Sequence, residues 1–135
     1  MNHQEYLKLA IKIGNQVAKP YNFGAVVVKA GSIIAAEHGH VHSQNNPSLH
    51  AEIAAIVTAC KNQSSNEVAG AILYSSHEPC VMCFSCASWA HIDKIIYAID
   101  SSKLSQDMYE YVDRDLQELS KKLHRPMGVE HIPLY

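Results

Sequence analysis

Apolar residues along the chain recur at two different periods, and these periods predict where helices and strands form. From His3 to Val17, apolar side chains follow helical spacing with polar residues between them, at Tyr6, Leu9, Ala10, Ile13 and Val17. We expect an amphipathic helix that buries this stripe. Gly14 lies near its end and Pro20 closes it.

Two short runs rich in β-branched residues follow this helix, Phe23–Val28 and Ser32–Ala36. Because they flank the glycine-containing turn Lys29-Ala30-Gly31, they predict an antiparallel hairpin. Val26 to Val28 contains no polar residue, which predicts a strand that is buried on both faces.

The rest of the chain alternates helical and extended patterns. Ser48 stands where an N-cap residue would accept backbone N–H bonds, and Pro79 stands where proline opens a helix. The predicted elements are a helix over Leu49–Asn62, a strand over Gly70–Ser75, a helix over Cys80–Ala90, a strand over Lys94–Ile99, a helix over Tyr111–Leu123 and an extended segment over Val129–Tyr135. The polar stretch Asp100–Glu110 is expected to be irregular.

A hairpin followed by alternating strands and helices predicts a three-layer α/β/α fold with a mixed five-stranded sheet. The connection between the last two strands has the length and the helix that a parallel pair requires, so we expect these strands to be parallel. Without repeats or linkers, residues 1–135 are interpreted as a single domain.

Composition favours a compact globule that acts on a small molecule. The chain has 135 residues, 47% of them hydrophobic, with a formal net charge of −2. Its longest basic run is Lys121-Lys122, whereas proteins that grip folded nucleic acid usually present a basic face. No run of 18 apolar residues and no secretion signal are found, so we expect a cytoplasmic protein without a membrane span.

The cysteines indicate metal chemistry rather than disulfides, because Cys80, Cys83 and Cys86 fall within seven residues. His50 and Glu52 lie in the first turn of one predicted helix, and Cys80 and Cys83 lie in the first turn of another. One histidine and two cysteines supply three zinc ligands and leave a fourth position for water, as in catalytic zinc sites. Glu52 stands where it can accept a proton from that water.

Three other interpretations of these histidines and cysteines have less support than a catalytic zinc site. Cys86 could complete a structural zinc site, but it faces away from the start of its helix. A redox C-x-x-C motif would leave the histidine and glutamate without a role. A second metal site could use the alternate histidines, although a strand end with its side chains on one face explains the same pattern: His38, His40 and His42. Cys60 and Cys86 are interpreted as packed thiols.

Two segments resemble motifs of the cytidine-deaminase-like superfamily. Pro47–Ile53 contains its H-A-E motif, Leu73–Cys83 contains its E-P-C-x-M-C motif, and Phe23–Val27 fits its first strand. The resemblance extends over roughly Phe23 to Ile99 and is nearest to the branch of guanine deaminases and tRNA adenosine deaminases.

This resemblance implies a zinc-dependent hydrolytic deaminase that releases ammonia from a nucleobase or nucleoside. It implies one Zn²⁺ per subunit, with water or hydroxide as the fourth ligand. The implied ligands are His50, Cys80 and Cys83, and Glu52 is the implied proton shuttle. Family members of this type are usually dimers, so a homodimer is expected.

Several features resemble guanine deaminases in particular, including Phe23 before Gly-Ala-Val, Trp89 after the C-x-x-C motif and the ending Glu130–Tyr135. The side chains expected to contact the base are Phe23, His38, His40, Trp89, Asp107 and Tyr135, with Glu110 as an alternative to Asp107. His38 and His40 stand near the position where the family usually has an asparagine. The expected substrate is a guanine-type purine.

Other functions remain as alternatives. A tRNA adenosine deaminase would predict a basic C-terminal helix, whereas residues 111–122 mix both charges. A cytosine or cytidine deaminase would share the same zinc motifs. A non-catalytic, zinc-stabilised interaction module is the most remote of these hypotheses.

Overall fold

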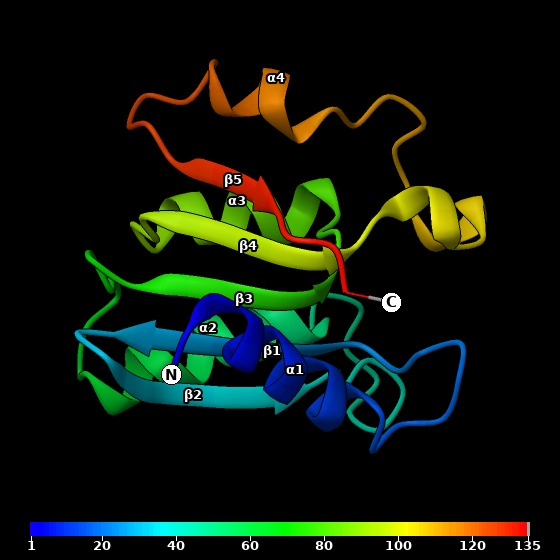
Figure 1. The fold of residues 1–135 in the computed structure, drawn as a ribbon, viewed down its shortest axis with the longest axis horizontal. Coiled ribbons are helices and arrows are strands. Elements are labelled where there is room, and N and C mark those ends of the chain that lie inside the picture. Colours follow the sequence, from blue (N-terminus) through cyan, green and yellow to red (C-terminus); the bar gives the residue numbers. More distant parts are fainter. Residues whose placement is uncertain (135) are drawn as a thin grey trace.

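The computed structural model describes residues 1–134, which form one sheet with helices on both faces (Figure 1). In chain order the elements are α1 (His3–Gly14), β1 (Gly24–Lys29), β2 (Ser32–His38), α2 (Ala51–Asn62), β3 (Ile72–His77), α3 (Val81–Trp89), β4 (Lys94–Ile99), η1 (Ser101–Lys103), η2 (Gln106–Met108), α4 (Leu116–Ser120) and β5 (Gly128–His131).

The sheet is mixed, with the strand order β2-β1-β3-β4-β5. Strand β1 pairs antiparallel with β2 and β3, whereas β4 pairs parallel with both β3 and β5. The β3–β4 connection contains α3 and the β4–β5 connection contains α4, which gives both crossovers the length that parallel pairing requires. The predicted mixed five-stranded sheet with parallel last strands is confirmed.

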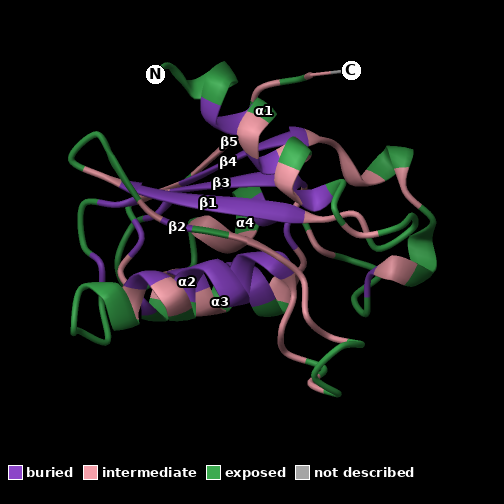
Figure 2. Cartoon of the chain, turned by 90° about the horizontal axis from the view of Figure 1, so that it is seen from below, coloured by how far each residue is buried: buried purple, intermediate pink, exposed green. Residues whose placement is uncertain are grey.

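Figure 2 shows α1 on one face of the sheet and both α2 and α3 on the other. Successive side chains of a strand point to opposite faces, so Tyr74 of β3 packs on the α1 side and Leu73 packs on the α2 and α3 side. Val26 and Val27 of β1 are likewise divided between the two cores, and both are fully buried. The expected burial of this strand on both faces is confirmed.

Two predicted helix starts differ from the structure. Helix α2 begins at Ala51 with His50 as its N-cap, because the Ser48 hydroxyl donates to Asn46 Oδ1 at 2.6 Å and is not available to the helix. Helix α3 begins at Val81 with Cys80 as its N-cap, so Pro79 precedes the helix and does not open it.

Helix α1 is shorter than predicted and ends at Gly14 instead of Val17. Its start is fixed by Asn2, which accepts a hydrogen bond from the Glu5 N–H at 2.9 Å, while the Glu5 carboxylate accepts from the Asn2 N–H at 3.1 Å.

The predicted helix Tyr111–Leu123 is wrong in length, since α4 covers Leu116–Ser120 only. Asp115 starts the helix by accepting N–H bonds from the two residues Gln117 and Glu118, and Val112 before it is 95% exposed. The apolar spacing therefore reflected a few buried contacts, such as Leu116, rather than one continuous helix. The predicted extended segment Val129–Tyr135 forms a strand, β5, only over Gly128–His131, and Tyr135 lies outside the described residues.

Among residues 1–134, no helix is long and apolar enough to cross a membrane.

Gly24 allows α1 to approach the sheet closely. A Cβ atom at this position would lie 1.9 Å from the Ala10 carbonyl oxygen and 2.6 Å from the Gly14 nitrogen. We expect Gly24→Ala to lower the free energy of unfolding by about 1–3 kcal/mol, because backbone atoms must move to accept the methyl group. Urea unfolding measures this change.

Gly128→Ala is the matched control, since the three atoms nearest to a Cβ there all belong to the flexible Lys94 side chain, of which Cγ is closest at 3.2 Å. Its free energy of unfolding should stay within about 0.5 kcal/mol of the parent protein. An equal decrease in the free energy of unfolding of both variants would show that the close approach of α1 to β1 does not make Gly24→Ala especially destabilising.

Candidate active site

The two helix starts on one face of the sheet bring together the residues of the H-A-E and C-x-x-C motifs. His50 is the N-cap of α2 and Cys80 is the N-cap of α3. Neither residue uses its side chain to cap its helix, although N-cap residues commonly do so. Both side chains are therefore available for another partner.

His50, Cys80 and Cys83 form a compact group of ligand atoms. The His50 Nδ1 lies 3.6 Å from the Cys80 Sγ, and the three ligand atoms lie within 4.8 Å of one another. In tetrahedral zinc with ordinary bond lengths, a nitrogen and a sulfur ligand lie about 3.6 Å apart. The donor atoms and their spacing fit a zinc ion held by these three side chains.

Hydrogen bonding and burial set the protonation of these sulfurs. The pKa of Cys80 is lowered to about 4, chiefly because its sulfur accepts a hydrogen bond from Cys83 and also bonds His50. The Cys83 pKa is raised, because its proton is shared with Cys80 and the thiol is buried. The hydrogen bond to Cys80 also raises the pKa of His50. Cys80 is therefore the anionic sulfur of the group, at a helix N-terminus whose dipole favours negative charge.

Glu52 is the buried acid of the site. It lies in the first turn of α2 and is only 6% exposed. Burial, together with the negative charge of Cys80, raises its pKa to about 7. A carboxyl group with a pKa near neutrality exchanges protons readily in both directions, which suits general acid–base chemistry.

A pocket of about 530 Å³ opens at this group, and His50, Glu52 and Cys80 line it. This volume is in the range of small-molecule sites. Of the side chains predicted to contact a base, Phe23, His38 and Asp107 also line the pocket.

Three other predicted side chains are not among those that line the pocket. Trp89 is 82% exposed at the opposite end of α3 from Cys83, because six residues advance a helix by about 9 Å. His40 instead pairs with Glu37, with 3.1 Å between its Nε2 and the Glu37 Oε2. Glu110 is exposed to solvent.

Within residues 1–134, the His50, Cys80 and Cys83 group is the only histidine, cysteine or carboxylate cluster with ligand atoms close enough for a metal ion. The alternate histidines contact other groups: His38 Nδ1 lies 2.9 Å from the Gly39 carbonyl oxygen, and the His42 ring packs edge-on to Tyr21. None of the four cysteines forms a disulfide.

Beside the predicted Asp107, the segment after β4 supplies pocket residues that the sequence pattern did not identify. Leu104, Met108 and Tyr109 line the pocket from this side. The Tyr109 hydroxyl donates to the Glu78 carbonyl oxygen at 2.7 Å, and burial raises the pKa of Tyr109. Arg114 lies over the Tyr109 ring, 4.2 Å from its centroid. An aromatic residue within a polar stretch was the available sequence signal.

Comparison with known proteins identifies the family. Residues 1–99 match the family described as the cytidine and deoxycytidylate deaminase zinc-binding region. The guanine deaminase of Bacillus subtilis (strain 168) is 33% identical over 141 residues, covering 98% of this chain and 90% of that protein. The tRNA-specific adenosine deaminase of Aquifex aeolicus is 32% identical over 100 residues, covering 73% of this chain and 66% of that protein.

A solved structure from studies of A-to-I editing by tRNA:A34 deaminases at the wobble position of transfer RNA has a TM-score of 0.78 and 27% identity. The superposition covers 95% of this chain and 92% of that one. The resemblance inferred from the motifs is thereby confirmed, and the chain belongs to the cytidine and deoxycytidylate deaminase family of zinc-dependent enzymes that remove amino groups by hydrolysis.

Proposed function

We propose that this protein releases ammonia by hydrolysis from a free nucleobase or nucleoside, and that its substrate is a guanine-type purine. The observation that carries the proposal is the buried carboxyl group of Glu52 beside the His50, Cys80 and Cys83 group, at a pocket of small-molecule size. One Zn²⁺ held by these three side chains would lower the pKa of a bound water and make it a nucleophile near neutral pH.

Glu52 moves the protons in this proposal. Its carboxylate accepts a proton from the attacking water, and the resulting carboxylic acid donates that proton to the amino nitrogen that leaves as ammonia. The same group can perform both transfers because burial holds its pKa at about 7. Only 6% of the Glu52 surface is exposed to solvent, and the low dielectric of such a buried position strengthens the electrostatic contacts of its carboxyl group.

The pocket surface suits a planar base with a polar edge. Phe23, Leu104 and Met108 contribute apolar surface, while Asp107 and His38 contribute polar groups. Similarity to the B. subtilis guanine deaminase over 98% of the chain supports a purine of the guanine type.

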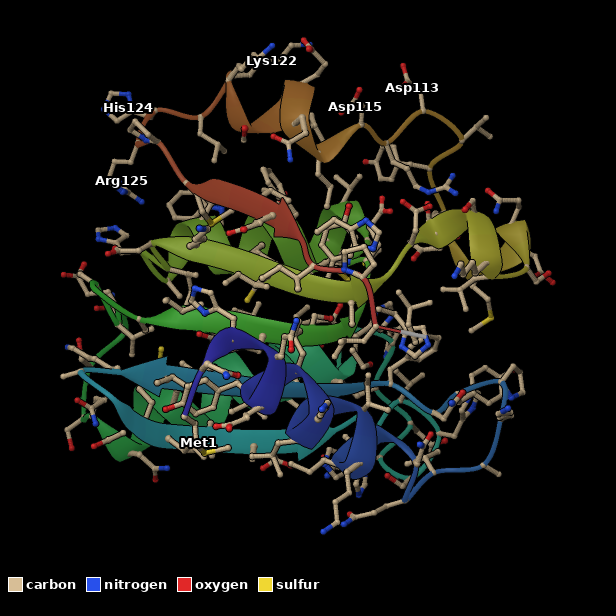
Figure 3. All side chains as sticks on the ribbon, viewed as in Figure 1. Met1, Asp113, Asp115, Lys122, His124 and Arg125 are labelled. Carbon is tan, nitrogen blue, oxygen red and sulfur yellow. The ribbon has the colours of Figure 1, made fainter. Side chains whose placement is uncertain are left out.

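A transfer RNA substrate has weaker support. The charged side chains around α4 include both acids and bases, and Figure 3 shows Asp113, Asp115, Lys122 and Arg125 at this edge of the molecule. An RNA-binding face usually concentrates positive charge.

An ammonia-release assay with a substrate panel tests the choice of base. The panel contains guanine, guanosine, adenine, cytosine, cytidine and an anticodon stem-loop that carries a wobble adenosine. We expect the highest kcat/KM with guanine, because the pocket has the size and mixed surface for a free base. Turnover of the stem-loop alone would reverse this ranking in favour of the tRNA deaminase function.

Cys83→Ala tests the metal site. We expect at least about a 100-fold loss of zinc affinity, since even residues that only support a metal ligand cost 10- to 100-fold when lost. Zinc content after dialysis, measured by mass spectrometry of the metal, checks this. Cys86→Ala on the same helix is the control and should retain zinc. Full retention of zinc by Cys83→Ala would refute the assignment of this ligand.

Glu52→Gln tests proton transfer. The variant keeps the shape of the side chain but cannot accept the proton, so kcat should fall by about 10²- to 10⁴-fold while zinc remains bound. Ammonia release and zinc content are measured on the same sample. Glu118→Gln, at an exposed position of α4, is the control and should leave kcat unchanged. A fully active Glu52→Gln enzyme would contradict the proton-shuttle role.

A further inference from the structure

His77 is a buried, titratable residue at the pocket that the proposed chemistry does not use. It is the last residue of β3, where it pairs with Ile99 of β4, and it is 7% exposed. Its side chain lines the pocket together with Glu52 and Cys80. A polar ring that is more than nine-tenths buried needs a structural or functional partner for each of its nitrogens.

Two contacts fix the orientation of the His77 ring. The Ser76 hydroxyl oxygen lies 2.7 Å from the His77 Nδ1. The Phe23 ring packs edge to face against the imidazole, with centroids 4.7 Å apart and an interplanar angle of 82°. Because β3 lies in the interior of the sheet between β1 and β4, the backbone that carries the ring is also fixed.

The hydrogen bonds of Ser76 identify which nitrogen carries the proton. Ser76 is fully buried, and its oxygen accepts the Gly24 N–H at 2.9 Å. The remaining partner of this hydroxyl in the described part of the chain is the His77 Nδ1. Donation of the hydroxyl hydrogen to Nδ1 is the arrangement that leaves no hydrogen of the buried hydroxyl unpaired. The proton of the neutral imidazole then lies on Nε2. Burial lowers the pKa of His77 to about 4, which keeps the ring neutral at pH 7.

The Nε2–H group has no hydrogen-bond partner among residues 1–134. It is not sealed inside the protein either, because the Arg114 Nε is the one fully enclosed, unpartnered side-chain nitrogen or oxygen in the same residues. Since His77 lines the pocket, its unpaired donor is open to a molecule that enters there. A preoriented donor on a buried wall favours ligands that offer an acceptor and disfavours those that do not.

We propose that His77 recognises the substrate by donating a hydrogen bond from Nε2 to an acceptor on the base, either a ring nitrogen or a carbonyl oxygen. This role rests on the proposed function, because it assigns a contact within the same pocket. It restricts the substrate to heteroaromatic amines with an acceptor on the edge that faces β3. The Ser76 hydroxyl acts as a positioning group, since it holds the tautomer that makes His77 a donor.

The test combines changes in the protein with changes in the substrate. Guanine is the reference substrate, and three analogues of it are the probes. In 3-deazaguanine and in 7-deazaguanine one ring nitrogen is replaced by C–H, and 2-aminopurine lacks the carbonyl oxygen. If the substrate panel selects another base, the corresponding deaza and carbonyl-free analogues of that base are used. We expect the parent enzyme to disfavour one analogue by about tenfold or more in kcat/KM.

His77→Phe should lower kcat/KM for the preferred base by about the factor by which the parent enzyme disfavours the analogue without the acceptor. For that analogue, kcat/KM of His77→Phe should stay within about twofold of the parent value. His77→Gln places an amide N–H near the position of Nε2 and should recover part of the loss. His124 does not line the pocket and lies near Lys122 and Arg125 at the α4 edge of the molecule (Figure 3). His124→Phe is therefore the matched control and should behave as the parent enzyme. Zinc content and circular dichroism on each variant separate loss of recognition from loss of structure.

Nitrogen-15 NMR of the imidazole provides a readout that does not depend on turnover. We expect His77 to be the neutral Nε2–H tautomer at pH 7. An Nδ1–H tautomer would overturn the proposal, as would a His77→Phe enzyme that discriminates among the analogues as the parent does. A parent protein that releases ammonia from no base would instead overturn the proposed function, and the recognition role with it.

Discussion

The convergence of two helix N-termini at one end of the sheet is the constraint on which the site depends. Cys80 follows β3 directly and starts α3, while His50 ends a loop and starts α2 on the same face of the sheet. The pairing of β3 with β1 and β4 fixes the end of β3, and with it the position of Cys80 at the pocket. Because both cap residues leave their side chains free, the two helix starts deliver three soft ligands to one point.

Burial has opposite chemical effects on the two groups beside these ligands. It raises the pKa of the Glu52 carboxyl to about 7, so that this side chain can hold or release a proton near neutral pH. It lowers the pKa of His77 to about 4, which makes that ring a fixed neutral hydrogen-bonding group. In the proposed function, one pocket therefore holds a proton carrier, Glu52, and a neutral hydrogen-bond donor, His77. The two roles differ because burial disfavours the charged form, which is the deprotonated form of a carboxyl group and the protonated form of an imidazole.

Local patterns predicted elements well where one face of an element is buried along its whole length. The strands around Val26 and Ile96 and the helices after His50 and Cys80 were of this kind. The predicted helix from Tyr111 to Leu123 was wrong in length, because its apolar residues pack through separate turns and Val112 faces solvent. Boundaries also shifted where a side chain found a local partner, as Ser48 did with Asn46.

The sequence by itself determined the family and the donor set, because H-A-E and P-C-x-x-C fix which side chains stand at two helix starts. Only the tertiary structure decided which distant residues share the pocket. It brought Tyr109 to the wall and left Trp89 at the far end of α3. It also gave His77 its unpaired donor, since that property depends on Ser76, Gly24 and Phe23 meeting around one ring. Such contacts join separate strands and loops, and no local spacing specifies them.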